Sequence, residues 1–347
     1  MHEGRATFRF EKIKSLGKVL VRMTNSQEIL KVEALEKTFP IHGSFFSKKR
    51  GFVHAVSKVS FEMFKGETLG IVGESGCGKT TLGLCLLRII EPTGGKIFFE
   101  GKDILFLDRM KLQALRKRIQ IIFQDPFGSL DPQWSVGRIV GEGLTIHKIA
   151  HGSEMEDRVD TMLKKVGLNP EYKFRSPNEF SGGQRQRIGI ARALILEPEL
   201  LIGDEPMSAL DVSIQAQIIN LLTQLQNEFH FSFLMISHDL SAVKYVSDRV
   251  GVMYLGKLVE IARSHDIYHS PHHPYTQALL SAIPLPDPTT RKKRIILRGD
   301  IPSPANPPTG CCFHTRCIKK IDICAKEEPK LKEVKPSHYC ACHIQEA

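Results

Sequence analysis

Short apolar runs separated by glycine- and proline-rich turns recur along the chain. Continuous apolar runs, typical of fully buried strands, occupy residues 68–72, 119–123, 200–203 and 231–236. Alternating apolar and polar positions predict half-buried strands at 32–39 and 53–63, and further strands are expected near 249–254 and 257–261. Helical spacing follows several of the strands, at 79–90, 112–118 and 213–229 and directly after residue 181. The pattern predicts an α/β fold whose mixed sheet core begins with an antiparallel part.

Three segments depart from this alternation. Residues 134–180 read as mostly helical, with apolar positions such as Val159 and Leu163 at helical spacing, and form an insert; we place a helical subdomain at about 125–180. Seven prolines between 284 and 308 predict an extended linker over 284–310, because proline cannot donate to a β-ladder. Residues 1–22 hold six basic and two acidic residues. We hypothesise that translation starts at Met23; the alternative is a basic arm lying on a membrane surface.

The stretch GESGCGKTT at 73–81 links a predicted buried strand to a predicted helix. It matches the phosphate-cradling P-loop, G-x-x-x-x-G-K-T. Glycines let consecutive backbone N–H groups point inward, and the following helix adds the positive end of its dipole. Lys79 would reach the β- and γ-phosphates, and Thr80 would place a hydroxyl on magnesium. The predicted phosphate-binding residues are Gly73, Glu74, Ser75, Gly76, Cys77, Gly78, Lys79, Thr80 and Thr81.

Polar residues follow three other predicted strands at their carboxyl ends, where doubly wound sheets bind ligands. Gln124 follows one, the pair Asp204-Glu205 follows the next, and His238 follows the third. The acidic pair suits magnesium binding and the polarisation of an attacking water. Phe39 is a candidate to stack on an adenine ring, although an ordinary core aromatic is an equal alternative. Ser181 is a plausible N-cap, so Gly182 and Gly183 open a helix start that forms a second anion site.

Composition, net charge and cysteine positions limit the class of protein and the kinds of site. A hydrophobic content of 41% and a charged content of 25% are ordinary for a globular protein, and no apolar run approaches the length that spans a bilayer. The net charge of +10 fits nucleic acid, an anionic membrane surface or nucleotide phosphates without choosing among them. Six of the eight cysteines fall in the last 37 residues, and a metal or iron–sulfur site is favoured over disulfides there.

FSGGQ at 180–184, combined with the P-loop, Gln124 and His238, decides among the P-loop classes. With these motifs the sequence resembles the ATP-binding subunits of ABC transporters from about Val32 to Ala282, so that 23–283 form the cassette. The resemblance implies a dimer in which each ATP lies between one subunit's P-loop and the other's SGGQ stretch. It implies that Glu205 is the general base and that His238 steadies the γ-phosphate. It also implies that magnesium is bound by Thr80, Gln124 and Asp204. The ATP of the partner subunit would be contacted by Ser181, Gly182, Gly183 and Gln184, and Asp211 would communicate across the dimer.

HPYTQALLSAIPLPDP at 273–288 and ILRGDIPSPANPPTGCCFHTRC at 296–317 narrow the family further. Together with CACH at 340–343 they resemble the extension of oligopeptide and dipeptide importer ATPases, most of all the second subunit of the ATPase pair. The resemblance implies that the Cys-rich extension, 311–347, holds a four-iron four-sulfur cluster on Cys311, Cys317, Cys324 and Cys342; zinc or free thiols are the alternatives.

The expected function is therefore the ATP-hydrolysing subunit of a peptide importer at the cytoplasmic face of the inner membrane, with ATP and magnesium as cofactors. Expected partners are a second ATPase subunit, two integral membrane permease subunits and, indirectly, a peptide-binding protein; no nucleic acid is expected. The rival class is a soluble ABC ATPase acting on ribosomes or DNA, which the basic net charge would suit. Import of another solute such as nickel is a further alternative.

Overall fold

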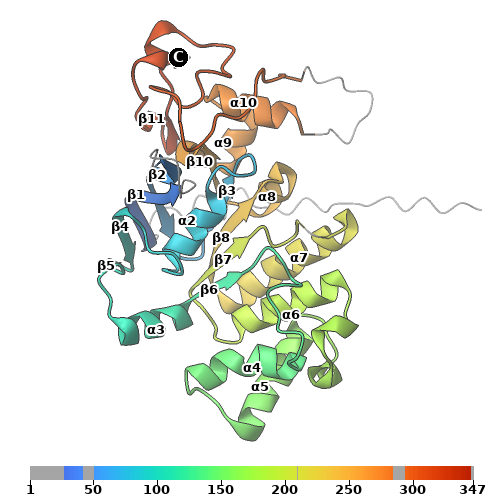
Figure 1. The fold of residues 1–347 in the computed structure, drawn as a ribbon. Helices are drawn as coiled ribbons and strands as arrows, with labels where there is room; N and C mark the ends of the chain where they lie inside the picture. Colours follow the sequence, from blue (N-terminus) through green and yellow to red (C-terminus); the bar gives the residue numbers. More distant parts are fainter. Residues whose placement is uncertain (1–26, 42–50, 209, 284–293, 345–347) are drawn as a thin grey trace, which may run out of the picture.

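The computed structural model describes residues 27–41, 51–208, 210–283 and 294–344, and Figure 1 shows how their elements are arranged. A central sheet is flanked by helices, and a smaller sheet lies at one side of it. The C-terminal segment lies at the top of the view in Figure 1. The basic stretch 1–22 and the candidate start at Met23 lie outside the described residues.

The central sheet has the strand order β11-β12-β10-β9-β3-β8-β7-β6. Its core is parallel: β3 (Thr68–Val72) lies between β8 (Ser232–Ser237) and β9 (Arg249–Tyr254), and β7 (Leu200–Asp204) pairs with β8 and with β6 (Ile119–Ile122). Every residue of β3, β7 and β8 is buried. Because these strands are parallel, their carboxyl ends meet at one edge of the sheet.

The smaller sheet is antiparallel, as the alternation along residues 32–63 predicts. It has the order β2-β1-β4-β5, from β1 (Glu28–Ile41), β2 (Gly51–Phe64), β4 (Gly94–Phe99) and the two-residue β5 (Lys102–Asp103). Both long strands extend beyond their predicted bounds. Their buried side chains pack with those of β3 and of α2 (Lys79–Leu86) in one core, which supports the P-loop from below.

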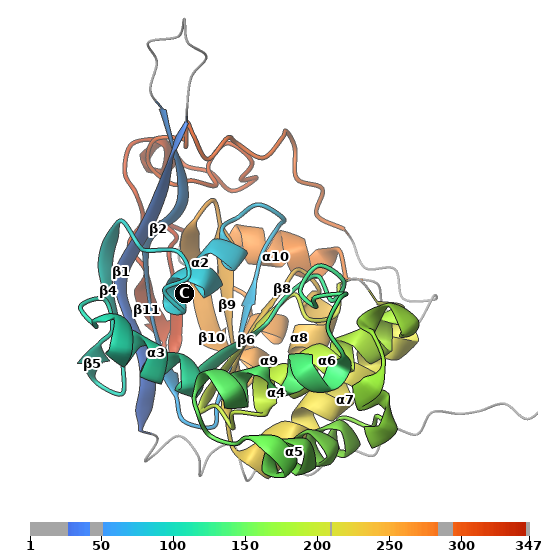
Figure 2. The ribbon, with the colours of Figure 1, turned by 60° about the horizontal axis from the view of Figure 1, so that its bottom comes forward.

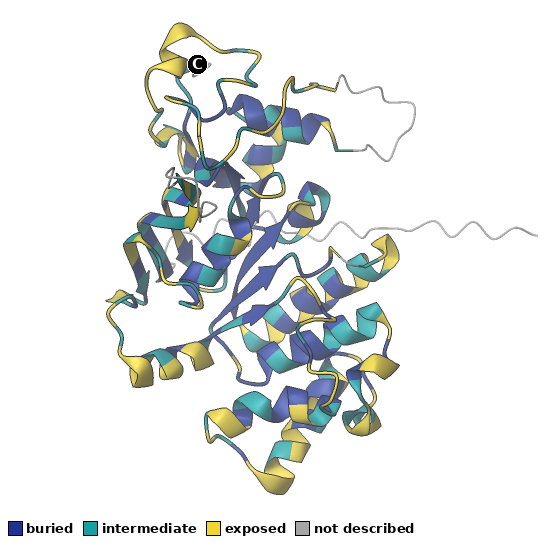
Figure 3. Ribbon diagram, viewed as in Figure 1, coloured by how far each residue is buried: buried dark blue, intermediate teal, exposed yellow. Residues whose placement is uncertain are grey.

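Helices form a separate region on the other side of the central sheet, as Figure 2 shows. It comprises α4 (Val136–Ile146), α5 (Gly152–Lys165), the 3-10 turns η1 (Pro170–Phe174) and η2 (Pro177–Glu179), and α6 (Gly182–Leu194). Val159 and Leu163, the positions that indicated helical spacing, are buried in the core there. Helix α3 (Arg109–Arg118), α7 (Val212–Phe229) and α8 (Leu240–Val246) complete the flanks, and Figure 3 shows how exposed the outer turns of α3 and α5 are.

The C-terminal segment adds strands to the central sheet, which the sequence pattern did not predict. The chain leaves the sheet through β10 (Lys257–Arg263) and then forms α9 (Ser264–His269) and α10 (Pro274–Ser281). It returns through η3 (Asp322–Ala325) to β11 (Lys332–Lys335) and β12 (His338–Cys340). Because β12 pairs antiparallel with β10, the tail is part of the sheet.

The predicted proline-rich linker is described from residue 294 onward. Residues 294–310 contain no helix or strand. The segment is not a free spacer, however, because Pro304 O accepts a hydrogen bond from His54 N of β2 at 3.0 Å. This contact fixes part of the linker against the smaller sheet.

Two predicted helix bounds differ from the structure. The helix after the P-loop was expected to reach Ile90 but ends at Leu86, where the chain turns toward β4. Helix α3 begins at Arg109 rather than at Leu112, because the Asp108 side chain accepts a hydrogen bond from Lys111 N and caps it.

A buried carboxylate joins the tail to the cassette. Glu260 of β10 is fully buried; its Oε1 lies 2.7 Å from His338 Nε2 of β12, and Oε2 accepts from His273 N at 3.1 Å. Burial alone would raise the pKa of Glu260, but hydrogen bonds, the one with His338 foremost, hold it below its usual range. His273 is also buried and caps α10, because its Nδ1 accepts from Tyr275 N. Burial lowers the pKa of His273 to about 4.

We predict that His273 makes the protein less stable as the pH falls. The unfolded side chain takes up a proton near pH 6.5 and the folded one only near pH 4, so between these values the unfolded chain binds more protons. Stability from this group is complete above pH 6.5 and is lost toward pH 4. By pH 5 the loss should be about 2 kcal/mol.

Urea unfolding at pH 7 and pH 5 measures this loss. His273→Asn is the matched variant, because asparagine keeps a capping oxygen and does not titrate. It should lose less stability than the wild type over the same interval. An equal loss in both proteins would contradict the prediction.

Candidate nucleotide site

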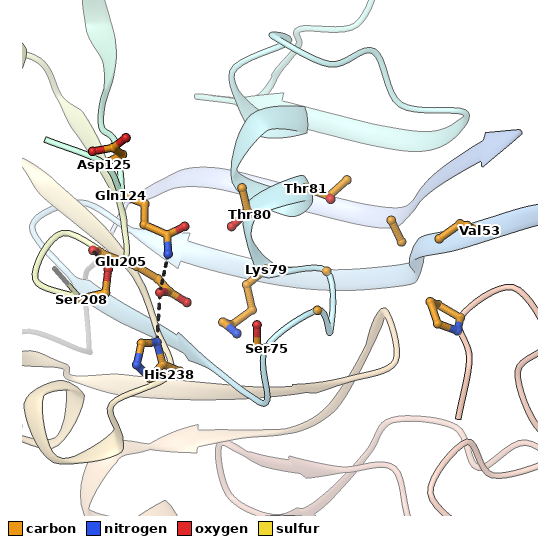
Figure 4. Close-up of a pocket in the computed structure, with 14 residues that line it drawn as sticks. Val53, Ser75, Lys79, Thr80, Thr81, Gln124, Asp125, Glu205, Ser208 and His238 are labelled. Atoms are coloured by element: carbon orange, nitrogen blue, oxygen red, sulfur yellow. Dashed lines mark hydrogen bonds and ion pairs between the residues drawn. The ribbon is translucent and has the colours of Figure 1, made fainter. Parts of the chain in front are cut away.

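A cavity of about 740 Å³ opens at the carboxyl ends of the central strands. Figure 4 shows the P-loop on one side and the polar residues after β6, β7 and β8 on the other. The lining combines both groups with a few residues of β2 and of the C-terminal segment. These residues are Val53, Ala55, Ser75, Gly76, Gly78, Lys79, Thr80, Thr81, Gln124, Asp125, Glu205, Ser208, His238 and Pro304.

The P-loop presents unpaired helix-start amides to this cavity. Gly78 is the N-cap of α2, which has no side-chain capping hydrogen bond. The first amides of α2 are therefore available to an anion, and the dipole of the helix favours one there. Gly78 has φ +100°, and a Cβ on it would lie 1.9 Å from Ala55 O. Only glycine fits where the loop passes β2 this closely.

Lys79 is buried and its ammonium stays within the loop. Nζ donates to Gly73 O at 2.9 Å and to Glu74 O at 3.0 Å. The two carbonyls hold the Lys79 ammonium at a position where it could contact phosphate oxygens. Burial raises the pKa of the Cys77 thiol, so this neighbour is neutral and adds no charge of its own.

Thr80 and Asp204 bring two oxygen ligands together across the sheet. Thr80 Oγ1 donates to Asp204 Oδ1 at 3.0 Å, which joins the first turn of α2 to the end of β7. Burial raises the pKa of Asp204, although the Thr80 hydroxyl and the Lys79 charge oppose that shift. A hydroxyl and a buried carboxylate are ligands of the kind that Mg²⁺ prefers, and a cation there would stabilise the charged carboxylate.

Glu205 is the contact point of three strand ends. Its Oε2 accepts from Gln124 Nε2 at 3.0 Å and lies 3.0 Å from His238 Nδ1 (Figure 4). Glu205 has φ 45°, an uncommon left-handed conformation for a side chain of this size, and its N–H donates to Ile236 O of β8. This turn directs the carboxylate away from the strand and toward the cavity.

The second predicted anion site does not line this cavity. At the start of α6 the Ser181 hydroxyl accepts from Gln184 N, and Gln184 Oε1 accepts from Ser181 N, which is a capping box. A Cβ on Gly183 would lie 2.7 Å from Ile214 Cγ2, so this turn packs closely on α7. Asp211 is the N-cap of α7 without a side-chain capping bond. None of Ser181, Gly182, Gly183, Gln184 and Asp211 belongs to the lining.

Phe39 also lies outside the lining, although its neighbour does not. In the ladder between β1 and β2 it stands opposite Val53, which lines the cavity. The ring of Phe39 lies instead 4.9 Å from the ammonium of Lys37 on the same strand. The sequence pattern predicted the strand that contains Phe39, and the stacking of Phe39 on an adenine ring stays a prediction.

The four tail cysteines predicted to hold an iron–sulfur cluster are neighbours in the fold but do not form a site for a single metal ion. Within the described ranges no group of three or more His, Cys, Asp or Glu side chains could hold a metal ion. Burial raises the pKa of Cys311 to about 11 and raises the pKa of Cys317 and Cys342, so these thiols are neutral. The described residues therefore give no support to the cluster, and no catalytic role of Glu205, Gln124 or His238 depends on it.

Sequence reasoning missed several lining residues. Asp125 and Ser208 follow residues that the motifs identified, and their positions could have been suggested by adjacency. Pro304 comes from the proline-rich segment, and no local signal in the sequence places it beside β2. One residue of the cavity lining therefore comes from the C-terminal segment.

Comparison with known proteins identifies the family. Residues 56–208 match the ABC transporter family model, and residues 259–324 match the model of the oligopeptide/dipeptide transporter C-terminal region. The chain is 53% identical over 323 residues to the oligopeptide transport ATP-binding protein AppF of Bacillus subtilis, which covers 92% of this chain and 98% of that protein. The chain belongs to the ATP-binding proteins of oligopeptide/dipeptide ABC transporters.

Other relatives agree with this family. The chain is 56% identical over 287 residues to a putative peptide import ATP-binding protein of Brucella ovis, covering 83% of this chain and 90% of that protein. The solved dimeric post-hydrolysis structure of the ATP-binding cassette MJ0796, bound to ADP and Pi, is 26% identical, with a TM-score of 0.61 over 68% of this chain and 99% of that one. The structure of cbiO1 from Clostridium perfringens is 31% identical, with a TM-score of 0.60, and covers 70% of this chain and 92% of that one. These findings do not favour a ribosome, DNA or nickel role.

We predict that Gly78→Ala weakens nucleotide binding while the cassette stays folded. The added methyl group would meet Ala55 O at 1.9 Å, and this backbone oxygen belongs to a paired strand that cannot easily move. Binding of a fluorescent ATP analogue should weaken by about tenfold or more, since the loop must move to relieve the contact.

Gly76→Ala is the matched control. Gly76 also has a positive φ, of 76°, but a Cβ on it would meet no atom within 4 Å outside its own chain neighbours. It should show only the backbone strain of about 1 kcal/mol and a much smaller loss of binding. Equal losses in the two variants would contradict the steric explanation.

Proposed function

We propose that this ABC transporter ATP-binding protein hydrolyses ATP to power peptide import through separate membrane subunits. The observation that carries the proposal is the Glu205 carboxylate, held by Gln124 and His238 opposite the P-loop, in a chain whose C-terminal region matches the peptide-transporter model. A phosphate cradle alone is common to many NTPases. A carboxylate directed into the same cavity adds a group that can activate water.

Phosphate binding is assigned to the P-loop and the start of α2. The backbone amides of residues 73–81 would surround the β- and γ-phosphates, and Lys79 Nζ would exchange part of its contact with the loop carbonyls for phosphate oxygens. Thr80 Oγ1 and Asp204 Oδ1 would hold magnesium, with Gln124 nearby. When bound, the ion neutralises charge that develops on the phosphate oxygens.

Hydrolysis is assigned to the residues that follow β6, β7 and β8. Glu205 would accept a proton from the attacking water, because its carboxylate is the acidic group directed into the cavity from β7. Gln124 and His238 each contact the same carboxylate oxygen and would orient it, while the exposed edge of His238 would meet the γ-phosphate. Gln124 follows β6 and His238 follows β8, and these strands are the two neighbours of β7 in the sheet. The sheet therefore fixes both side chains relative to Glu205.

The site is completed by a second subunit in this proposal. The helix start at Ser181, with Gly182, Gly183 and Gln184, would be the second anion site, and it lies outside this cavity. A second ATPase subunit would place its equivalent segment over the bound ATP, and Asp211 would lie near that contact. Support comes from the MJ0796 cassette, whose solved structure is described as dimeric.

The membrane subunits are proposed to dock on the helical region. A groove of about 440 Å³ lies between α4, α5 and η1, and Trp134, Gly141 and Phe174 are among its lining. The Phe174 side chain is 77% exposed beside it, and the Arg138 guanidinium lies 3.7 Å from the Trp134 ring. A groove whose lining combines apolar residues with charged residues of both signs, Arg138 and Lys173 beside Glu142 and Glu156, suits a short amphipathic helix of a partner. None of the described helices has the length and apolarity to cross a membrane, and the proposal places the chain at the cytoplasmic face.

We predict that Glu205→Gln retains ATP binding and loses hydrolysis. Glutamine keeps the shape and the contact with Gln124 but cannot take a proton, so turnover should fall by about a hundredfold or more. Steady-state phosphate release and equilibrium binding of an ATP analogue measure the two effects separately.

Lys79→Ala provides the contrast, because it should weaken binding itself. Turnover of Glu205→Gln near the wild-type rate would show that another group is the base. A wild-type protein that fails to bind ATP would contradict the proposed function as a whole.

The four-iron four-sulfur cluster in the tail stays a prediction from the family resemblance. If it forms, anaerobically purified protein should contain iron and acid-labile sulfide in equal amounts, and Cys311, Cys317, Cys324 and Cys342 should resist thiol reagents. Zinc in place of iron, or full thiol titration without metal, would contradict it.

A further inference from the structure

Two motifs of the C-terminal region converge on one residue of the P-loop. Glu74 follows Gly73 directly after β3, and its carboxylate forms a two-pronged ion pair with Arg316 of the tail, at 2.8 Å from Nη1 to Oε2 and 3.3 Å from Nη2 to Oε1. Its backbone N–H donates to the hydroxyl of Tyr275 on α10 at 2.9 Å. Arg316 and Tyr275 both lie in the range that matches the C-terminal-region model.

The ion pair is shielded from solvent on the tail side. The Arg316 side chain is 9% exposed and that of Glu74 is 24% exposed. Arg316 lies over the ring of Tyr254, which packs with Tyr275 and with Phe313, three residues before Arg316. This aromatic cluster fixes the guanidinium from behind. A paired, little-exposed charge of this kind has a larger effect than an ion pair on the open surface.

Glu74 is coupled directly to the phosphate-binding lysine. Its carbonyl is one of the two oxygens that accept from Lys79 Nζ, at 3.0 Å, and the next residue, Ser75, lines the nucleotide cavity. The backbone N–H, carbonyl and carboxylate of Glu74 are therefore held by three different segments. Loss of Arg316 would release the side chain and leave a carboxylate charge beside the place where the anionic phosphates bind.

From these contacts we infer that Arg316 is a positioning residue for nucleotide binding. It holds the first turn of the P-loop in place through Glu74, with Tyr275 as the second support, and it neutralises a carboxylate next to the phosphate cradle. The inference rests on the proposed ATP binding and deepens it, because it makes the C-terminal tail part of the nucleotide site. The residue acts through Glu74 and does not itself touch the nucleotide.

The test compares single and double variants of the full chain. Arg316→Ala should raise the dissociation constant of a fluorescent ATP analogue and the KM for ATP by about fivefold or more, because an unpaired carboxylate then opposes phosphate binding. The kcat should stay within about twofold, since Glu205, Gln124 and His238 are not contacted by Arg316. Arg316→Lys should restore part of the affinity, because it keeps the charge without the planar fork.

Second-site rescue separates this role from a merely structural one. Glu74→Gln added to Arg316→Ala should recover part of the lost affinity, because it removes the uncompensated charge. A tail that had simply lost its fold would not be rescued by a substitution in the P-loop. Lys326→Ala, which removes an exposed cation from the same tail, is the matched control and should bind ATP like the wild type.

The outcomes distinguish this inference from the proposed function. If the wild type binds ATP and Arg316→Ala binds it equally well, the positioning role is overturned while the ATPase assignment stands. Equal affinity of Arg316→Ala with and without Glu74→Gln would overturn the charge argument as well. Failure of the wild type to bind ATP would instead overturn the proposed function.

Discussion

The position of the Glu205 carboxylate depends on one constraint of the fold: the carboxyl ends of parallel strands lie at the same edge of the sheet. Gln124, Glu205 and His238 follow three different strands, and the 3.0 Å contacts among them exist because β6, β7 and β8 are neighbours in register. The same arrangement places Asp204 within reach of Thr80 from α2. No long loop has to bring these groups together. Their geometry is therefore as stable as the buried sheet that carries them.

The P-loop is supported on its other side by the hairpin of β9 and β10 and by the tail. Gly256 N, in the turn of that hairpin, donates to Cys77 O at 2.9 Å. Tyr254 at the end of β9 belongs to the aromatic cluster that packs against Arg316. The tail in turn is joined to β10 by the pairing of β12 and by the buried contact of Glu260 with His338. Sheet, hairpin and tail thus form a continuous support behind the phosphate cradle.

Local signals in the sequence predicted most of the cassette. The buried strands, the P-loop and the polar residues after each strand follow from short-range patterns, because each depends on a few neighbouring residues. The tail was the weaker part. The contact between Arg316 and Glu74 joins residues 242 positions apart, and β12 is three residues long. Neither feature produces a periodic pattern of apolar residues in the sequence. The adenine-stacking role of Phe39 stays a prediction: the sequence pattern predicted the strand, whereas the pairing of Phe39 with Val53, which lines the cavity, has no local signal.

The two helix starts proposed to bind phosphate differ in how they are capped. The helix start of α2 is open, with its amides available at the cavity, whereas the start of α6 is capped by Ser181 and Gln184. A capped helix start still carries the positive end of the dipole but offers fewer unpaired amides. In the proposed function, a nucleotide would therefore bind first to the P-loop and only then attract the second helix start of another subunit. This proposed order would make dimer closure depend on bound ATP.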